Sequence, residues 1–219
     1  MNLISVQVGL PRLVRWRGEP VSTGIFKEPV KGRIKLRKLN LDGDRQADLT
    51  VHGGKDKAVY VYPSEHYAYW RAELPGTELP YGMFGENFTT KGIDESSVNI
   101  GDHFRIGEAE VVVTQPRMPC YKLGIKFGRP DIVNRFHLSG RSGFYLAVSG
   151  EGEVGAGDAL EIVKRDEHNI TVADINRLYF HDKDDLETLR RAVQIEALPY
   201  AWRRIFVKQL EELESLQSR

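Results

Sequence analysis

Glycine is distributed unevenly along this chain of 219 residues, and this constrains its fold more than any other feature. All 21 glycines lie at or before position 157, and none follows. Glycine is favoured in turns and disfavoured inside helices. We therefore expect short strands and turns in the first part and helices in the last. The composition changes near 164–169, which predicts two domains, 1–165 and 166–219.

The first region carries the patterns of many short strands. Residues 30–37 alternate between apolar and basic positions, which predicts a half-buried strand. Further β-rich runs are found at 58–62, 98–107, 110–114 and 144–163. Two short helices are expected, 63–74 opened by Pro63 and 131–140 ended by Gly140. Together these predict a mainly β fold, a closed or nearly closed β-barrel with a few short helices.

Residues 166–219 show the spacing of three helices. The apolar stripe is strongest around Trp202, Phe206 and Leu210, and Pro199 can occupy the first turn of that helix. The region holds 8 basic and 11 acidic residues, against 23 and 20 in the remainder. The acidic balance argues against a helix-turn-helix that binds DNA. We interpret the region as a packing module or as the contact surface of a homodimer.

Composition excludes several classes of protein. Basic and acidic residues both number 31, so a general polyanion binder is not expected. No apolar run approaches the roughly 20 residues of a membrane helix, and the first residues do not resemble a secretory signal. The one cysteine, Cys120, excludes an internal disulfide framework and a zinc site of four cysteines. We expect a cytoplasmic protein without membrane partners.

Cys120 lies in the sequence TQPRMPCYKLG (114–124), directly after a β-rich run. Pro116 and Pro119 restrict the backbone, so the thiol is expected to project from a rigid loop. Arg117 and Lys122 flank it, and nearby cations favour the thiolate, which is both a nucleophile and a soft-metal ligand. An inert buried cysteine is the alternative, and the two prolines and two cations argue against it.

Three other segments carry polar residues of the kind that hold a phosphate or a polar cofactor. Thr23, Gly24 and Lys27 combine a hydroxyl, a flexible backbone and a cation. The glycine pair Gly53-Gly54 follows His52 and permits close approach to a ligand, and Glu86 and Asn87 lie in a glycine-flanked turn. Each segment alone is also compatible with an ordinary polar turn.

Taken together and in this order, the motifs resemble the MOSC domain family (molybdenum cofactor sulfurase C-terminal domain). The motifs are TGIxKxPV at 23–30, HGGxxKAVYxY at 52–62, FGEN at 84–87, QPRxPCxK at 115–122 and GxVxxGD at 152–158. The chain is most similar to YiiM-type members, which carry a short three-helix domain after the barrel.

The resemblance implies a barrel that binds a molybdopterin-type molybdenum cofactor, with Cys120 as the metal ligand and catalytic residue. It also implies reduction of N-hydroxylated compounds such as 6-hydroxylaminopurine, a detoxifying activity. Our hypotheses for the cofactor's other contacts are Lys27, Thr23, His52, Gly53, Gly54, Asn87, Arg117 and Lys122. No cysteine set for an iron–sulfur cluster and no flavin-binding glycine motif is present, so electrons are expected from a separate reductase.

Two alternatives remain at this level. A sulfur carrier or transferase would use Cys120 as a persulfide. A nucleic-acid-binding barrel would use the basic segment 12–38, although it leaves the glycine pair and Cys120 without a role.

Overall fold

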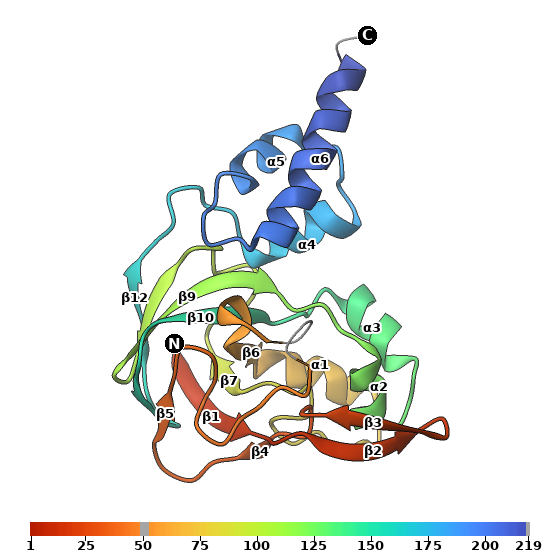
Figure 1. Cartoon of the computed structure of the whole chain (residues 1–219), viewed down its shortest axis with the longest axis vertical. Helices are drawn as coiled ribbons and strands as arrows, with labels where there is room; N and C mark the ends of the chain where they lie inside the picture. Colours follow the sequence, from red (N-terminus) through yellow and green to blue (C-terminus); the bar gives the residue numbers. More distant parts are fainter. Residues whose placement is uncertain (49–52, 218–219) are drawn as a thin grey trace.

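The computed structural model describes residues 1–48 and 53–217. Its main feature is an eight-stranded sheet with the order β12-β8-β9-β10-β6-β7-β1-β4 (Figure 1). The strands are β1 (Asn2–Val8), β4 (Glu28–Pro29), β6 (Val59–Pro63), β7 (Phe88–Lys91), β8 (His103–Ile106), β9 (Ala109–Pro116), β10 (Phe144–Gly150) and β12 (Leu160–Lys164). β6 and β7 run parallel, whereas the other neighbouring strands run antiparallel.

The sheet curls but does not close into a barrel among the described residues. An isolated bridge joins Asn2 to Ala159, and the Leu3 amide donates to the Asp158 carbonyl at 2.9 Å. These contacts bring β1 against the segment before β12 without a continuous ladder. Helices make up 28% of the structure and strands 29%, so the fold is mixed rather than mainly β.

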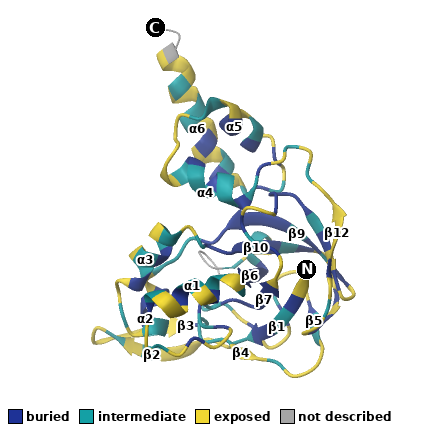
Figure 2. Cartoon of the chain, turned by 180° about the vertical axis from the view of Figure 1, so that it is seen from behind, coloured by how far each residue is buried: buried dark blue, intermediate teal, exposed yellow. Residues whose placement is uncertain are grey.

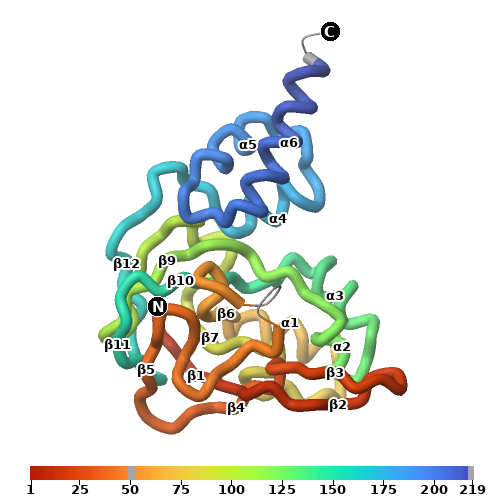
Figure 3. Tube along the Cα trace, in the orientation of Figure 1, coloured from red at the N-terminus to blue at the C-terminus, as the bar shows by residue number. Residues whose placement is uncertain are grey.

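Two small sheets complete the strands. β2 (Arg12–Trp16) and β3 (Glu19–Thr23) form a hairpin whose two turn residues, Arg17 and Gly18, both have positive φ. Such a turn matches the twist of a hairpin. β5 (Ile34–Leu36) pairs with β11 (Gly152–Val154), as Figure 3 shows. The predicted strand 30–37 is therefore shorter than its alternation suggests, because its partner offers only three residues.

Helices cover one side of the curled sheet. They are α1 (Glu65–Glu73), α2 (Tyr121–Phe127) and α3 (Ile132–Ser139), with a 3₁₀ turn, η1 (Lys55–Lys57). Gly140 ends α3 in the left-handed conformation, as predicted. Pro63 is the last residue of β6 rather than the first of a helix, and α1 begins after Ser64. α2 was not predicted, because the two prolines before it indicated a loop.

The last region consists of α4 (Val172–Phe180), α5 (Leu186–Ala192) and α6 (Tyr200–Gln217). A capping box starts α4, in which Thr171 and Asp174 satisfy each other's backbone amides. Ile175, Leu178 and Phe206 are fully buried in a core shared with the sheet. β9 is buried along most of its length beneath these helices and β10 is buried at alternate residues, whereas the end of α6 projects beyond them (Figure 2). In the described residues, no helix has the length and apolar character to cross a membrane.

Candidate active site

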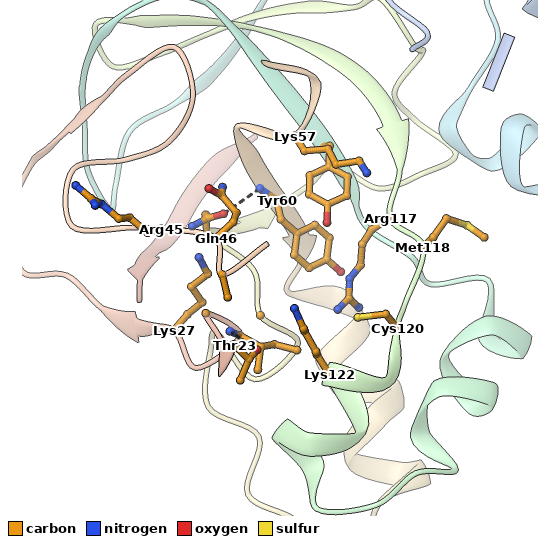
Figure 4. Close-up of a pocket in the computed structure, with 16 residues that line it drawn as sticks. Thr23, Lys27, Arg45, Gln46, Lys57, Tyr60, Arg117, Met118, Cys120 and Lys122 are labelled. Carbon is orange, nitrogen blue, oxygen red and sulfur yellow. Dashed lines mark hydrogen bonds between the residues drawn. The ribbon is translucent and has the colours of Figure 1, made fainter. Parts of the chain in front are cut away.

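A pocket beside the N-terminal end of α2 collects six of the predicted site residues. Thr23, Lys27, Asn87, Arg117, Cys120 and Lys122 all line it (Figure 4). It encloses about 650 Å³ of empty space, part of which is continuous with open solvent. Its walls come from the loop after β3, the start of β6, the loop before β7 and the segment between β9 and α2. Sequence positions that are far apart thus meet in one cavity.

Cys120 stands where β9 gives way to α2. β9 ends at Pro116, and Cys120 is the N-cap residue of α2, with an extended backbone. Its side chain does not cap the helix, and the residue is only partly buried. Pro116 is the last residue of β9 and Pro119 directly precedes the N-cap of α2, so both ends of the segment are anchored. Its rigidity stays a prediction. The thiol therefore opens into the pocket.

Arg117 lies next to Cys120 on the pocket wall (Figure 4) and is only 6% exposed. Its guanidinium carbon lies 4.9 Å from the centre of the Tyr60 ring and 5.0 Å from that of Phe136. Burial, the largest influence, acts to lower the pKa of Arg117, but Tyr60, Tyr145 and Cys120 raise it above its ordinary value. Its Nη1 is buried and has no hydrogen-bond partner among the described residues. The pocket thus contains a fixed positive charge with an unused donor.

Lys27 is held by a buried acid behind the pocket. Its Nζ forms an ion pair with Asp44, whose carboxylate also accepts from the Gly9 amide at 2.8 Å. Burial lowers the pKa of Lys27, whereas Asp44 acts to raise it. The ion pair fixes the position of the ammonium group at the edge of the cavity.

Asn87 completes this network. Its Nδ2 donates to Asp44 Oδ2 at 3.0 Å and to the Gln7 carbonyl at 3.2 Å, and its Oδ1 accepts from the Tyr60 amide. The amide thus orders Asp44 and, through it, Lys27. Direct contact of Asn87 with a cofactor stays a prediction. Glu86, next to it, points away and accepts from the amides of its own turn.

Glycines allow the pocket loops to pack backbone against backbone. A Cβ on Gly24 would lie 2.4 Å from the Arg45 carbonyl oxygen, far inside contact distance. Gly85 has a positive φ, and a Cβ there would meet the Ile25 side chain at 2.8 Å. Thr23 Oγ1 accepts from the Ile25 amide at 3.2 Å, which sets the turn. These contacts position the loop carrying Lys27.

Several lining residues were missed by the sequence reasoning. They are Ile25, Arg45, Gln46, Ala47, Lys57, Tyr60, Gly85, Met118 and Tyr145. Arg45 and Lys57 belong to the polar segment around the glycine pair, so their charge was a usable signal. Tyr60 and Tyr145 looked like ordinary strand residues. With these included, the lining carries five cations and no acid, since Asp44 lies behind Lys27.

Gly53 and Gly54 do not line this pocket, whereas Lys57 and Tyr60 of the same motif do. His52 lies outside the described residues, whereas Gly53 and Gly54 line a second pocket that faces α6. Gly54 has φ of 99°, a conformation that favours glycine. The second pocket shares Lys57 and Met118 with the first, so the two cavities are neighbours.

The basic segment 12–38 is partly neutralised. Arg33 pairs with Asp158 at 2.9 Å, and Arg37 pairs with Asp42 at the same distance. Lys38 donates to the carbonyls of Val148 and Ser149. The segment 12–38 therefore offers less free positive charge to a nucleic acid than its sequence suggests.

Comparison with known proteins gives matches over both regions of the chain. Residues 48–161 match the MOSC domain, and residues 170–213 match the YiiM-like 3-alpha helix domain. The uncharacterized protein YflK of Bacillus subtilis is 42% identical, over 97% of this chain and 96% of its own. The crystal structure of YiiM from Geobacillus stearothermophilus superposes with a TM-score of 0.80 at 34% identity, over 95% of this chain and 98% of that one. A protein of Gibberella moniliformis named reductase is 30% identical to this chain. The match covers 88% of this chain and 35% of that protein.

Proposed function

Because the chain belongs to the MOSC domain family and carries a YiiM-like three-helix domain, we propose that it is an oxidoreductase that uses a molybdenum cofactor to reduce N-hydroxylated compounds. The observation that carries the proposal is the Cys120 thiol in a pocket lined by five cations and no acid. A relative named reductase supports an oxidoreductase role.

The donor set fits a metal that arrives inside an anionic cofactor. Within the described part of the chain, no three His, Cys, Asp or Glu residues gather as a set for a bare ion. A molybdopterin needs less from the protein: one thiolate for the metal, and cations for its phosphate. The unpaired Nη1 of Arg117 is a buried donor that such an anion would satisfy.

Each residue would then have a distinct task. Cys120 would hold the metal, Arg117 and Lys122 would bind acidic groups beside it, and Lys27 would bind from the opposite wall. When bound, the cofactor supplies a two-electron reduction that takes up the oxygen of an N–O bond. The balance is R–NHOH plus two electrons and two protons giving R–NH₂ and water. The electrons would come from a separate reductase.

The sulfur-carrier alternative uses the same thiol. A persulfide carries no phosphate, so it leaves the buried Nη1 of Arg117 without an acceptor. The pocket therefore favours the cofactor.

The proposal is tested by assaying protein purified from a host that makes the cofactor. With reduced methyl viologen as donor, we expect 6-hydroxylaminopurine to be converted to adenine, two electrons per product. Absence of both pterin and turnover in that preparation would refute it.

A further inference from the structure

The β2–β3 hairpin packs against α2, and Figure 1 and Figure 2 show the two elements side by side from opposite directions. The Trp16 ring lies on α2, since a Cβ added to Gly124 would be 3.7 Å from it. A groove follows this contact and is lined by Trp16, Arg17, Tyr121, Pro130 and Val133. Tyr121 is 52% exposed, so the groove offers an aromatic ring to solvent. We call the following residues the hairpin surface: Arg12, Trp16, Arg17, Tyr121 and Lys126.

Two cations of the hairpin surface lie against the same aromatic ring. The guanidinium carbon of Arg12 lies 3.6 Å from the centre of the Phe26 ring, and Nζ of Lys126 lies 5.0 Å from it. Burial, the largest influence, lowers the pKa of Lys126; Glu86 and Glu28 act to raise it, and the charge of Arg12 lowers it. A bound anion would therefore relieve a repulsion that the fold holds in place.

The cations of the hairpin surface have no carboxylate partner. Among the residues that the structure describes, Arg12, Arg17 and Lys126 form no ion pair. Arg33 and Arg37, further along the basic segment 12–38, are both paired. The chain as a whole carries no net charge, so the excess of positive charge at the hairpin is local.

The hairpin surface adjoins the Cys120 pocket. Thr23, the last residue of β3, lines that pocket, and Cys120 is the N-cap of the helix that begins with Tyr121. α2 is 7 residues long, so its two ends lie only about 10 Å apart. A protein seated on the hairpin and α2 would thus lie close to the pocket without entering it.

We propose that the hairpin surface is the docking site of the electron donor, and that this donor is an acidic protein that carries a flavin or an iron–sulfur cluster. Redox partners meet through small, transient interfaces, and complementary charges steer their encounter. Unpaired cations beside an exposed aromatic ring suit such a contact. They are fewer than the phosphate contacts on which the binding of a nucleic acid depends.

This inference rests on the proposed function, which requires a separate reductase. The redox balance is the same: for each R–NHOH reduced, the donor loses two electrons in all, and two protons are taken up from water. The hairpin surface is assigned only the binding of the donor, so this binding can be measured without turnover.

The test measures donor binding and turnover separately on the full chain. The probe is flavodoxin, an acidic protein that carries flavin mononucleotide. Calorimetry should detect its binding to wild type at low salt, and the affinity should fall as salt is added. In the double variant Arg12→Gln, Lys126→Gln we expect the affinity to fall about tenfold. Turnover at limiting reduced flavodoxin should fall likewise, whereas turnover with reduced methyl viologen should not, since neither residue lines the Cys120 pocket.

Lys164→Gln is the matched control for the single variant Lys126→Gln. It removes the same charge from an exposed residue of β12, which lies across the molecule from the hairpin (Figure 1). We expect Lys126→Gln to weaken flavodoxin binding roughly threefold and Lys164→Gln to leave it unchanged. Arg17→Gln repeats the test in the turn of the hairpin, should the double variant fail to fold.

No binding of flavodoxin to wild type at low salt, or equal affinity in wild type and the double variant, would overturn the inference. Tighter binding of a single-stranded oligonucleotide than of flavodoxin, dependent on the same cations, would overturn it in favour of a nucleic acid. If the proposed function alone fails, flavodoxin still binds and depends on Arg12 and Lys126, but no N–O bond is reduced with either donor.

Discussion

The two neighbouring pockets are built in different ways. The Cys120 pocket is cationic, and its charges are held by buried groups: Asp44 fixes Lys27, and aromatic rings enclose Arg117. The second pocket is lined by the aromatic side chains Tyr179, Tyr200 and Trp202, and Tyr200 is 71% exposed. Lys57 and Met118 belong to both.

This difference in charge decides which pocket suits an anionic cofactor. A cofactor that stays bound requires charges fixed in advance, which buried ion pairs and close backbone contacts provide. The second pocket does not share this positive charge, because its lining holds one cation, Lys57, and one acid, Asp56. Three variants test what holds the Cys120 pocket and the three-helix region together, and they follow in order of decreasing effect.

Replacing Arg117 should have the largest effect of the three. In Arg117→Ala the cofactor loses a buried, charge-assisted donor, and we expect pterin affinity to fall roughly 10- to 100-fold. The affinity is compared by the amount of pterin that stays with each protein after gel filtration. Arg141→Ala is the matched control, because Arg141 also stacks on a ring, that of Tyr69 at 3.9 Å, but lies outside the pocket lining. Equal pterin loss in both variants would contradict a specific role for Arg117.

Replacing Gly24 tests whether the close packing of the pocket loops contributes to the stability of the fold. The new Cβ in Gly24→Ala would press on the Arg45 carbonyl, and overpacking of this kind costs about 1 to 3 kcal/mol. Thermal unfolding should show the loss, together with weaker cofactor retention. Gly150→Ala serves as the comparison, since a Cβ there meets its nearest atom at an ordinary 3.4 Å. Unchanged stability in Gly24→Ala would mean that the loop yields easily.

The smallest effect concerns acid stability of the three-helix region. Asp185 accepts from the Thr188 amide and side chain and pairs with Arg177, and these contacts lower its pKa from 3.8 to about 2. A lowered pKa contributes stability above pH 3.8 that is lost as the pH falls towards 2. Asp185→Asn should flatten the stability profile of α4 to α6 over that window, as followed by hydrogen exchange. If the stability of α4 to α6 changes with pH as steeply in Asp185→Asn as in wild type, Asp185 does not determine the acid stability of this region.

The residues that the sequence could indicate as pocket-lining were those concentrated in short motifs. Cys120, Arg117 and Lys122 share one segment, and its prolines and cations were sufficient to locate the thiol. Tyr60 and Tyr145 were missed because a residue that faces a cavity from a strand has the same pattern as one that faces a core. A closed or nearly closed barrel was expected because the spacing of glycines indicates many turns. That spacing does not indicate whether the two edge strands of the sheet pair with each other. The second pocket could not be predicted from the sequence, because it forms only where α6 packs against β9.

The molybdenum content of the wild type and of Cys120→Ala shows whether Cys120 is the metal ligand. The Cys120 side chain does not cap α2, so the variant should fold and melt like wild type. From a cofactor-producing host, we expect about one molybdenum per wild-type chain and almost none in the variant, as one thiolate ligand per metal requires. Equal molybdenum in both proteins would contradict the assignment of Cys120 as the metal ligand.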